Sequence, residues 1–392
     1  MVRPHDILIP PGTSWLTDPA GKAVCATIEA AGHDIYFVGG CVRNAILGLA
    51  DSDVDLSTSA RPKEVIALAE AAGLKAVPTG IDHGTVTVVS GGEGFEVTTF
   101  RRDVETDGRH AKVVFSNDIR EDARRRDFTM NALYATPRGQ VIDPLDGLPD
   151  LLARRVRFIE DAAARIREDY LRILRFFRFS AWYGDQSEGF DADTLAAISA
   201  NTDGLETLSA ERVGQEMAKL LAAPDPAPAL ATMQSCGVLA MVLPGADTRL
   251  LPLVVHAEQS LNMGADWLVR LAALGGEAPE TRFRLSRADA RHLGLLKEIG
   301  FAGPPLIEVA YRHSVGTSQG ALLLRSALAE TLPEKAVLET ICAASCQTFP
   351  VKAADLMPDY EGAALGAKLK ELEQLWIDSG FSLDRSALLG RA

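Results

Sequence analysis

The residues best suited to chemistry are two aspartates separated by one position. Asp53 and Asp55 lie in DSDVDLST, whose second half has the short apolar pattern of a strand. Side chains at i and i+2 of a strand point to one face, and Asp51 shares that face by spacing. Carboxylates held together repel each other unless a cation lies between them, and Mg²⁺ prefers such oxygen ligands. Metal ions there activate an attacking hydroxyl and stabilise leaving pyrophosphate. A solvated acidic turn has the same spacing, so both interpretations stay open.

A third carboxylate lies in FEVTTFR (95–101), a segment that alternates like a strand. Glu96 shares a face with Thr98, while Phe95 and Val97 occupy the opposite face. The spacing alone favours a solvent-facing side chain over a third metal ligand.

A glycine pair stands between a predicted strand and a predicted helix. The apolar run of HDIYFVGG ends at Gly39 and Gly40, and a helix is predicted for VRNAILGL (42–49). Backbone N–H groups at a helix start suit a triphosphate, and glycine permits close approach. Arg43, one turn into the helix, is within reach of a phosphate oxygen. A plain tight turn explains the two glycines equally simply.

Arginines dominate two later segments. ARRRDFTMNAL carries Arg126 and Asp127 on a predicted helix, with Asn131 on the face of Asp127. Arginine binds phosphate and sugar oxygens well through its planar fork, although a solvated basic helix end is the alternative.

A second arginine segment, REDYLRILRFFRFSAW, is predicted to form one continuous helix. Its polar side chains recur every three residues and form a spiral stripe, and these are Asp169, Arg172, Arg175 and Arg178. Asp169 and Arg172 can pair with each other, and together they match the hydrogen-bonding edge of a nucleotide base. A surface helix with ion pairs is the alternative.

The elements around these residues predict an α+β class. Residues 1–150 are expected to form a head with a mixed β-sheet and helices, followed by an all-α neck (151–225) and an all-α body and tail (226–392). Residues 103–113 are polar and unpatterned, which indicates a mobile loop.

Composition sets the broad class. The 392 residues carry a net charge of −13, but residues 101–180 carry +3 and can still bind phosphates. The chain has no apolar run long enough for a transmembrane helix and no secretory signal, so no membrane partner is expected. Five scattered cysteines indicate reduced thiols and a cytoplasmic location.

Seven motifs in order resemble one family, the bacterial class II CCA-adding tRNA nucleotidyltransferases and poly(A) polymerases of the polymerase β superfamily. The resemblance covers about residues 35–221. The motifs are GGCVRNAILG with DVD, EVTTFR, DGRHA, EDARRRDFTMNAL, DPLDG, EDYLRILRFFRF and SAERVGQE.

The resemblance implies a role for each matching residue. It implies Mg²⁺ ligation by Asp53, Asp55 and Glu96, which reverses the interpretation of Glu96 from spacing. Gly40 and Arg43 match the triphosphate-binding turn that begins at Gly39. Arg126 and Asp127 match the motif that holds the incoming nucleotide. Asp169 and Arg172 match the pair that reads the base, and Arg175 and Arg178 match further nucleotide contacts. The implied partners are CTP, ATP and the 3′ end of tRNA, and the body and tail (226–392) are implied to bind the tRNA, while the oligomeric state stays open.

Some points of the pattern leave alternatives. Position 44 is usually acidic in the family but is Asn44 here, and asparagine keeps the size and an acceptor. The motifs are shared with poly(A) polymerases and with enzymes that add only CC or only A. A non-catalytic tRNA-binding protein on the same fold is a further alternative. The segment 103–113 is a candidate hinge for switching from C to A addition.

Overall fold

The computed structural model describes residues 7–50, 53–107 and 110–391, so Asp51 lies outside the described residues. The chain forms two compact units. The first comprises Met1–Ser209 with Ser235–Met241, and the second comprises Ala210–Gln234 with Val242–Ala392. The division into head, neck and body stays a prediction.

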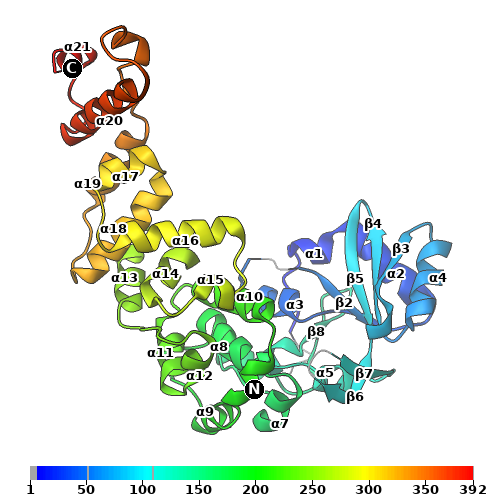
Figure 1. The fold of residues 1–392 in the computed structure, drawn as a ribbon. Helices are drawn as coiled ribbons and strands as arrows, with labels where there is room; N and C mark the ends of the chain where they lie inside the picture. Colours follow the sequence, from blue (N-terminus) through cyan, green and yellow to red (C-terminus); the bar gives the residue numbers. More distant parts are fainter. Residues whose placement is uncertain (1–6, 51–52, 108–109, 392) are drawn as a thin grey trace. The chain divides into compact units, whose positions relative to one another are not determined.

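A seven-stranded mixed sheet forms the centre of the N-terminal part (Figure 1). Its strands are β1 (Ile35–Val38), β2 (Asp55–Thr58), β3 (Lys75–Gly80), β4 (Thr85–Ser90), β5 (Glu93–Thr99), β8 (Tyr134–Ala135) and β9 (Val141–Ile142). Their order is β3-β4-β5-β2-β1-β8-β9. β2 and β5 run parallel and the other neighbours run antiparallel. The predicted α+β class with a mixed sheet is confirmed.

Helices accompany this sheet along the chain. They are α1 (Ser14–Thr17), α2 (Pro19–Ala30), α3 (Gly40–Leu47), α4 (Pro62–Ala71), α5 (Ile119–Arg124) and α6 (Leu148–Leu152), with 3₁₀ turns η2 (Ile81–His83) and η3 (Thr129–Asn131). Helix α4 begins where predicted because Pro62 occupies its first turn and the Glu64 carboxylate accepts a hydrogen bond from the Arg61 N–H at 2.7 Å. Phe95 and Val97 of β5 are buried, whereas Glu96 between them is exposed. The alternation predicted for β5 is therefore confirmed.

The segment predicted to be a mobile loop instead forms a β-hairpin. Strands β6 (Arg101–Asp107) and β7 (His110–Phe115) pair antiparallel as a separate two-stranded sheet, with an irregularity between Asp103 and Glu105. The loop prediction is wrong because strand pairing satisfies backbone groups whether or not the side chains alternate in hydropathy. A hinge role for this segment stays a prediction.

Three helices and a 3₁₀ turn follow in the first unit. They are α7 (Ala162–Glu168), α8 (Leu171–Tyr183), α9 (Ala192–Ser199) and η4 (Thr202–Thr207). Aromatic rings pack between α8 and the chain before it, with Phe128 lying 5.0 Å from Phe158 and 5.2 Å from Phe179, centroid to centroid. This packing fixes α8 against the segment that carries Arg126 and Asp127.

The chain from residue 210 onward is helical, as predicted. Its elements are α10 (Ala210–Leu221), α11 (Ala227–Ser235), α12 (Val238–Val242), α13 (Leu251–Leu261), α14 (Trp267–Leu274), α15 (Pro279–Arg282), α16 (Arg287–Gly300), α17 (Leu306–Arg312), α18 (Val315–Leu328), α19 (Lys335–Ser345), η5 (Ala353–Asp355), α20 (Gly362–Asp378) and α21 (Arg385–Leu389). Within the described ranges, none of the helices is long and apolar enough to span a bilayer.

A buried ion pair ties helices of the second unit together. The Arg270 and Glu258 side chains are each 2% exposed, and Arg270 Nη2 donates to Glu258 Oε2 at 2.7 Å. Arg270 Nη1 also donates to the carbonyl oxygens of Leu221 and Ala223, each at 2.5 Å. The guanidinium thus satisfies carbonyls at the end of α10, which have no partner within that helix.

The C-terminal residues form their own small core. Leu372, Trp376 and Ile377 of α20 pack with Val351, Leu356 and Leu388. Tyr311 of α17 packs against this cluster and donates a hydrogen bond to Glu373 Oε1 at 2.7 Å. One aromatic residue therefore joins α17 to α20 by both apolar and polar contacts.

Candidate active site

The predicted carboxylates converge at the parallel pairing of β2 and β5. Asp55 pairs in register with Glu96, so both side chains leave the same face of the sheet. Asp53 lies two residues before the start of β2 and is exposed. The pKa of Asp55 is raised because the surrounding protein desolvates the carboxyl, although the side chain remains exposed. Arg126 opposes this shift, and the charges of Glu96 and Asp53 add to it. Asp55 is therefore close enough to both Asp53 and Glu96 to be affected by their charges.

These carboxylates suit a divalent cation that also binds the substrate. In the part of the chain that the structure describes, no three His, Cys, Asp or Glu side chains close around a metal position by themselves. Mg²⁺ typically uses one or two protein carboxylates and completes its shell with water and substrate phosphates. Mutual repulsion at Asp55 is the feature that a bound cation would relieve.

The glycine turn lies beside an arginine. Gly39 adopts φ 75° and ψ −119°, a conformation that disfavours other residues, and Gly40 is the first residue of α3. A Cβ at Gly39 would lie 3.5 Å from Arg126 Nη1. Arg126 also acts electrostatically on Asp55. Arg126 is therefore close to both the turn at Gly39 and the carboxylate of Asp55.

A buried carboxylate that the sequence analysis did not single out positions Arg126. Asp122 of α5 is fully buried and accepts hydrogen bonds from Tyr134 OH at 2.8 Å and Ser57 Oγ at 3.1 Å. Its oxygens also pair with Arg125 Nη2 at 2.7 Å and Arg126 Nη2 at 3.3 Å. Burial alone would raise the pKa of Asp122, but Arg125, Arg126 and Tyr134 together lower it to about 2. Asp122 therefore stays ionised and joins β2 to the arginine pair.

Arg43 is held inside the protein by neutral partners. Its side chain donates to Asn131 Oδ1 at 2.6 Å, Asn44 Oδ1 at 2.9 Å and Tyr183 OH at 2.8 Å, and it lies 4.0 Å from the Tyr183 ring centroid. Burial lowers the pKa of Arg43. Direct phosphate binding by Arg43 stays a prediction, because these contacts already occupy most of its donors.

Asn44, which stands where the family usually has an acidic residue, makes hydrogen bonds that stabilise the local chain. Asn44 Nδ2 donates to the Ala50 carbonyl at 2.9 Å, and the Leu49 N–H donates to the Asn44 carbonyl at 2.9 Å. A carboxylate could accept from Arg43 but could not donate to Ala50. Asn44 therefore fastens the chain just after α3, in the connection that leads to Asp53.

Asp127 joins the head motif to α8. Its Oδ2 accepts from Arg175 Nε at 2.7 Å and Nη2 at 2.5 Å, and its Oδ1 accepts from Asn131 Nδ2 at 2.9 Å. Burial opposes ionisation, but Arg175 and Asn131 lower the pKa of Asp127 to about 2. The predicted helix through Asp127 and Asn131 is wrong, since α5 ends at Arg124 and η3 begins at Thr129. Their side chains nevertheless meet, because the 3₁₀ turn folds Asn131 back.

The predicted base-reading residues are split by a break in the helix. Asp169 is extended, with φ −155° and ψ 106°, and separates α7 from α8, so the prediction of one continuous helix is wrong. Arg172 Nη1 pairs with Glu168 Oε2 at 2.6 Å and donates to the Arg165 carbonyl at 2.9 Å. Glu168 was not a predicted site residue. Its carboxylate holds Arg172, and the Asp169 backbone lies outside both helices.

The arginine stripe along α8 is confirmed. Arg172, Arg175 and Arg178 are half-buried, whereas the residues between them are buried. The guanidinium carbons of Arg175, Arg178 and Arg43 lie 5.3, 4.3 and 5.2 Å from the ring centroid of Phe179. One aromatic ring therefore orders charged groups from both α3 and α8.

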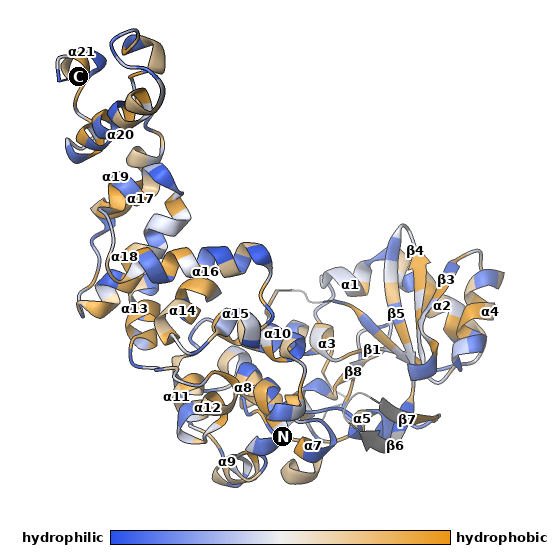
Figure 2. Cartoon of the chain, in the orientation of Figure 1, coloured by the Kyte–Doolittle hydropathy of each residue, from blue (hydrophilic) through white to orange (hydrophobic). Residues whose placement is uncertain are grey.

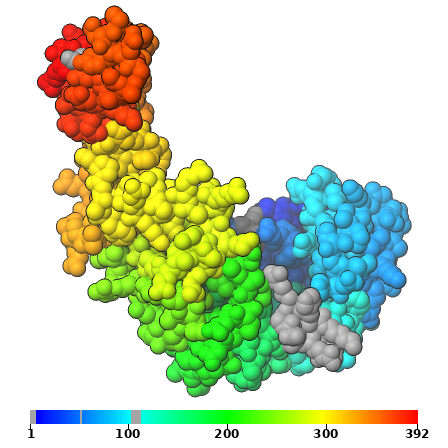
Figure 3. Space-filling view, viewed as in Figure 1, coloured from blue at the N-terminus to red at the C-terminus, as the bar shows by residue number. Residues whose placement is uncertain are grey.

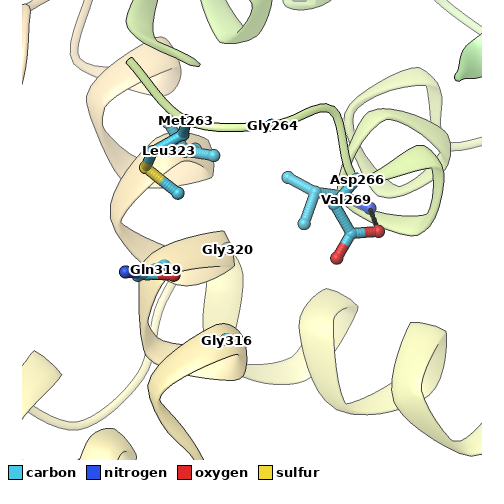
Figure 4. Close-up of a pocket in the computed structure, with 8 residues that line it drawn as sticks. All are labelled: Met263, Gly264, Asp266, Val269, Gly316, Gln319, Gly320 and Leu323. Atoms are coloured by element: carbon cyan, nitrogen blue, oxygen red, sulfur yellow. Dashed lines mark hydrogen bonds between the residues drawn. The ribbon is translucent and has the colours of Figure 1, made fainter. Parts of the chain in front are cut away.

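A separate cavity of about 310 Å³ lies in the second unit (Figure 4). Its lining residues are Met263, Gly264, Asp266, Val269, Gly316, Gln319, Gly320 and Leu323. The Asp266 carboxylate accepts hydrogen bonds from the N–H groups of Leu268 and Val269 and so caps α14. This cavity contains none of the predicted site residues.

Comparison with known proteins assigns this geometry to a family. Residues 35–157 match the model of the poly A polymerase head domain, and residues 189–250 match that of a probable RNA- and SrmB-binding site of polymerase A. The fold superimposes on the Bacillus stearothermophilus CCA-adding enzyme in complex with CTP with a TM-score of 0.72 and 26% identity, covering 93% of this chain and 94% of that one. Residues 35–157 of this chain therefore carry a head domain of the poly A polymerase family. The recognition of that family from the sequence motifs is confirmed.

Curated relatives match about half of this chain. A CCA-adding enzyme of Leuconostoc citreum is 46% identical over 198 residues, which are 50% of this chain and 47% of that protein. The mouse mitochondrial CCA tRNA nucleotidyltransferase 1 is 41% identical over 201 residues, 51% of this chain and 46% of that protein. The chain thus spans about half the length of these curated relatives. The Thermotoga maritima CCA-adding enzyme complexed with tRNA shares the fold at a TM-score of 0.69 with 17% identity over 98% of each chain.

Proposed function

We propose that this chain transfers nucleotides from CTP and ATP to the 3′ end of tRNA, adding C, C and A with release of pyrophosphate. The observation that carries the proposal is the in-register pairing of Asp55 with Glu96, next to Asp53 and Arg126. The carboxylate oxygens can hold a cation, and the guanidinium and the glycine turn supply hydrogen-bond donors. Together these groups suit the negative charge of a nucleoside triphosphate. The family's CCA-adding members include structures with CTP and with tRNA, which supports the same substrates here.

Mg²⁺ is the proposed cofactor, with Asp53, Asp55 and Glu96 as its ligands. Bound there, it supplies neutralisation of phosphate charge and activation of the attacking hydroxyl. The tRNA 3′ oxygen forms a bond to the α-phosphorus, and the bond from that phosphorus to the pyrophosphate oxygen breaks. Arg126, held by Asp122, orients the phosphates of the nucleotide, and the N–H groups that follow Gly39 contact them. These groups act by position and charge, and no covalent enzyme intermediate is needed.

Base selection is assigned to the start of α8. Asp169 and Arg172 present an acceptor and a donor fork, and Glu168 fixes the direction of Arg172. Arg175 and Arg178 contact the rest of the nucleotide, with Arg175 anchored by Asp127. The half-buried setting of these arginines limits competition from water. The five free cysteines further support a reducing, cytoplasmic location for the protein.

The decisive experiment supplies tRNA transcripts that end before CCA, after C and after CC. Each is incubated with purified protein, Mg²⁺ and labelled CTP, ATP or both, and the products are resolved at single-nucleotide length. Ordered addition that stops after A is expected. Long A tails would instead identify a poly(A) polymerase, and addition of only CC or only A would identify a partial enzyme.

A matched control separates catalysis from binding. The Asp53→Ala/Asp55→Ala variant is expected to bind tRNA as the wild type does but to incorporate no nucleotide. If the wild-type protein binds tRNA yet extends none of the three ends, the proposal of catalysis fails and a non-catalytic tRNA-binding protein remains.

A further inference from the structure

Arg43 differs from the other buried arginines in the kind of partner that it contacts. Among the residues that the structure describes, the buried arginines are Arg43, Arg165 and Arg270. Arg165 pairs with Glu168 and Arg270 pairs with Glu258, so a carboxylate neutralises each of these guanidinium groups. Arg43 is 5% exposed and, within the described ranges, has no carboxylate within 4.0 Å. A buried charge without a counter-ion is unfavourable, and an anion bound nearby would stabilise it.

Two asparagines hold the Arg43 guanidinium group through their amide oxygens. Asn44 Oδ1 accepts from Arg43 Nε at 3.1 Å and from Nη2 at 2.9 Å. Asn131 Oδ1 accepts from Arg43 Nη1 at 2.6 Å, and Asn131 Nδ2 donates to Asp127 Oδ1 at 2.9 Å. Asn131 therefore stands between Arg43 and the Asp127 carboxylate, which pairs with Arg175. Both amides supply acceptors for the guanidinium group but carry no negative charge.

The other end of the Asn44 amide fixes its orientation. Asn44 Nδ2 donates to the Ala50 carbonyl at 2.9 Å, so Oδ1 faces Arg43. A carboxylate at position 44 would place a second oxygen against that carbonyl and a full negative charge against Arg43. The Ala50 carbonyl therefore favours an amide at this position, and an amide preserves the positive charge of Arg43. Helix α3, which carries both side chains, belongs to the blue part of the chain in Figure 3.

Arg43 lies beside both the glycine turn and helix α8. Its backbone N–H donates to the Gly39 carbonyl at 3.0 Å, and the Asn131 carbonyl oxygen lies 3.8 Å from the position of a Cβ at Gly39. The Arg43 guanidinium group shares the Phe179 ring with Arg178 of α8, where hydrophilic and hydrophobic residues alternate (Figure 2). Burial lowers the pKa of Arg43, and the positive charge of Arg178 acts in the same direction. Positive charge is therefore concentrated next to the turn.

We propose that Asn44 is a positioning residue that holds the Arg43 guanidinium group without neutralising it, so that its charge strengthens binding of the triphosphate and of the pyrophosphate product. Contacts of Arg43 within the described residues use four of its five N–H groups. Its action through charge needs no direct contact, because Coulomb attraction extends over several ångströms in a partly desolvated site. This role of Asn44 rests on the proposed function for the identity of the nucleotide.

The test measures binding of inorganic pyrophosphate with Mg²⁺ to the whole chain by titration calorimetry, which needs no turnover. Asn44→Asp places a negative charge against Arg43, so the affinity for pyrophosphate is expected to fall about tenfold, which corresponds to about 1.4 kcal/mol. Asn44→Ala removes the same hydrogen bond to Ala50 but adds no charge, and its affinity is expected to stay within about threefold of the wild type. Asn117→Asp adds a charge at an exposed position of the same unit and is the matched control.

Steady-state kinetics separate the effect of charge from an effect on stability. Asn44→Asp is expected to raise the KM for CTP and for ATP about tenfold and to leave kcat at saturating nucleotide within about twofold of the wild type. The added charge acts on the phosphates in the ground state and in the transition state alike, which is why KM changes and kcat does not. Asn44→Ala is expected to lower the melting temperature without that rise in KM.

Equal pyrophosphate affinity in Asn44→Asp and the wild type would overturn the role of Asn44. An equal loss in Asn44→Ala would assign the effect to the bond with Ala50, and an equal loss in Asn117→Asp would remove any specific role of position 44. If Asn44→Asp does not fold, Arg43→Gln removes the same charge, and unchanged pyrophosphate affinity in that variant would overturn the proposal.

The outcomes also separate this role from the proposed function. A wild-type protein that binds pyrophosphate more tightly than Asn44→Asp but incorporates no nucleotide would overturn the proposed function and leave the role of Asn44 intact. Absence of pyrophosphate binding by an active wild-type protein would overturn the role of Asn44 alone.

Discussion

The two units bury charged pairs for different purposes. In the first, Asp127 is buried, but its partner Arg175 keeps 31% of its side chain exposed next to Arg178 and Arg172. In the second, Arg270 and Glu258 are each 2% exposed and contact helix carbonyls. The first pair has one end that a ligand can reach, whereas the second is sealed. Partial exposure therefore separates a pair that positions a site from a pair that holds helices.

The largest expected effect is on chemistry in the first unit. Replacing Asp55→Asn keeps the shape but removes a charge from the carboxylate group, so nucleotide incorporation is expected to fall by at least about a thousandfold. Because the pKa of Asp55 is raised in the folded protein, its charge is unfavourable there and thermal stability is expected to stay equal or rise. Single-turnover incorporation and thermal unfolding measure the two effects. An activity within tenfold of the wild type would remove Asp55 from the proposed site.

A change in the fully buried Arg270–Glu258 pair is expected to lower stability and leave activity unchanged. Arg270→Met leaves Glu258 buried without its cation, so the free energy of unfolding is expected to fall by about 3 kcal/mol. The rate per folded molecule should stay unchanged. Urea unfolding and active-site titration measure these quantities, and the Glu258→Leu/Arg270→Met double variant should recover much of the stability. A large fall in the rate of folded molecules would break the distinction between the two pairs.

Acid is expected to weaken the first unit before the second. Asp122 and Asp127 have pKa values of about 2, below those of an unfolded chain, so their contribution is present above about pH 4 and is lost as the pH falls towards 2. Each contributes on the order of 2 kcal/mol by this argument. Burial raises the pKa of Glu258, so its penalty is absent in acid and grows as the pH rises. Amide hydrogen exchange between pH 5 and 3 should show α5 and α8 losing protection before α13 and α14, and Asp127→Asn should reduce that difference.

The smallest expected effects come from removing the hydroxyl group of one tyrosine in each unit. Tyr183→Phe keeps the ring beneath Arg43 but removes its hydrogen bond, and stability is expected to fall by about 1 kcal/mol, with a higher KM for CTP and ATP. Tyr311→Phe removes the hydrogen bond to Glu373, and a similar loss of stability is expected without a change in nucleotide KM. Equal KM changes in both variants would show that Tyr183 acts through general stability alone.

Sequence patterns correctly predicted the features that depend on neighbouring residues of the chain. The run before Gly39, the alternation around Glu96 and the three-residue step of the α8 arginines follow from strand and helix geometry. Glu96 could be grouped with Asp53 and Asp55 only through the family resemblance, because the pairing of β2 with β5 joins segments about forty residues apart. Strand pairing of this kind is not encoded in either segment alone.

The side-chain contacts that sequence patterns did not predict join residues far apart in the chain. Arg43 meets Tyr183, 140 residues away, and Arg175 meets Asp127, 48 residues away. In the sequence, Asp122 is one acidic residue in a basic segment. Its role follows only from the fold, which brings Ser57 and Tyr134 into hydrogen bonds with its carboxylate. The break at Asp169 also escaped the helical pattern, because periodicity does not reveal where one helix ends and another begins in the same register.

The ring shared by three guanidinium groups makes mutational tolerance uneven along α8. A change at Arg178 removes one charged group from the face of Phe179, whereas a change at Phe179 alters the surroundings of Arg43, Arg175 and Arg178 together. A saturation library scored for growth or activity would therefore find the uncharged aromatic position less permissive than the arginines around it. In this helix the strongest mutational constraint is therefore expected at a side chain that carries no charge and performs no chemistry.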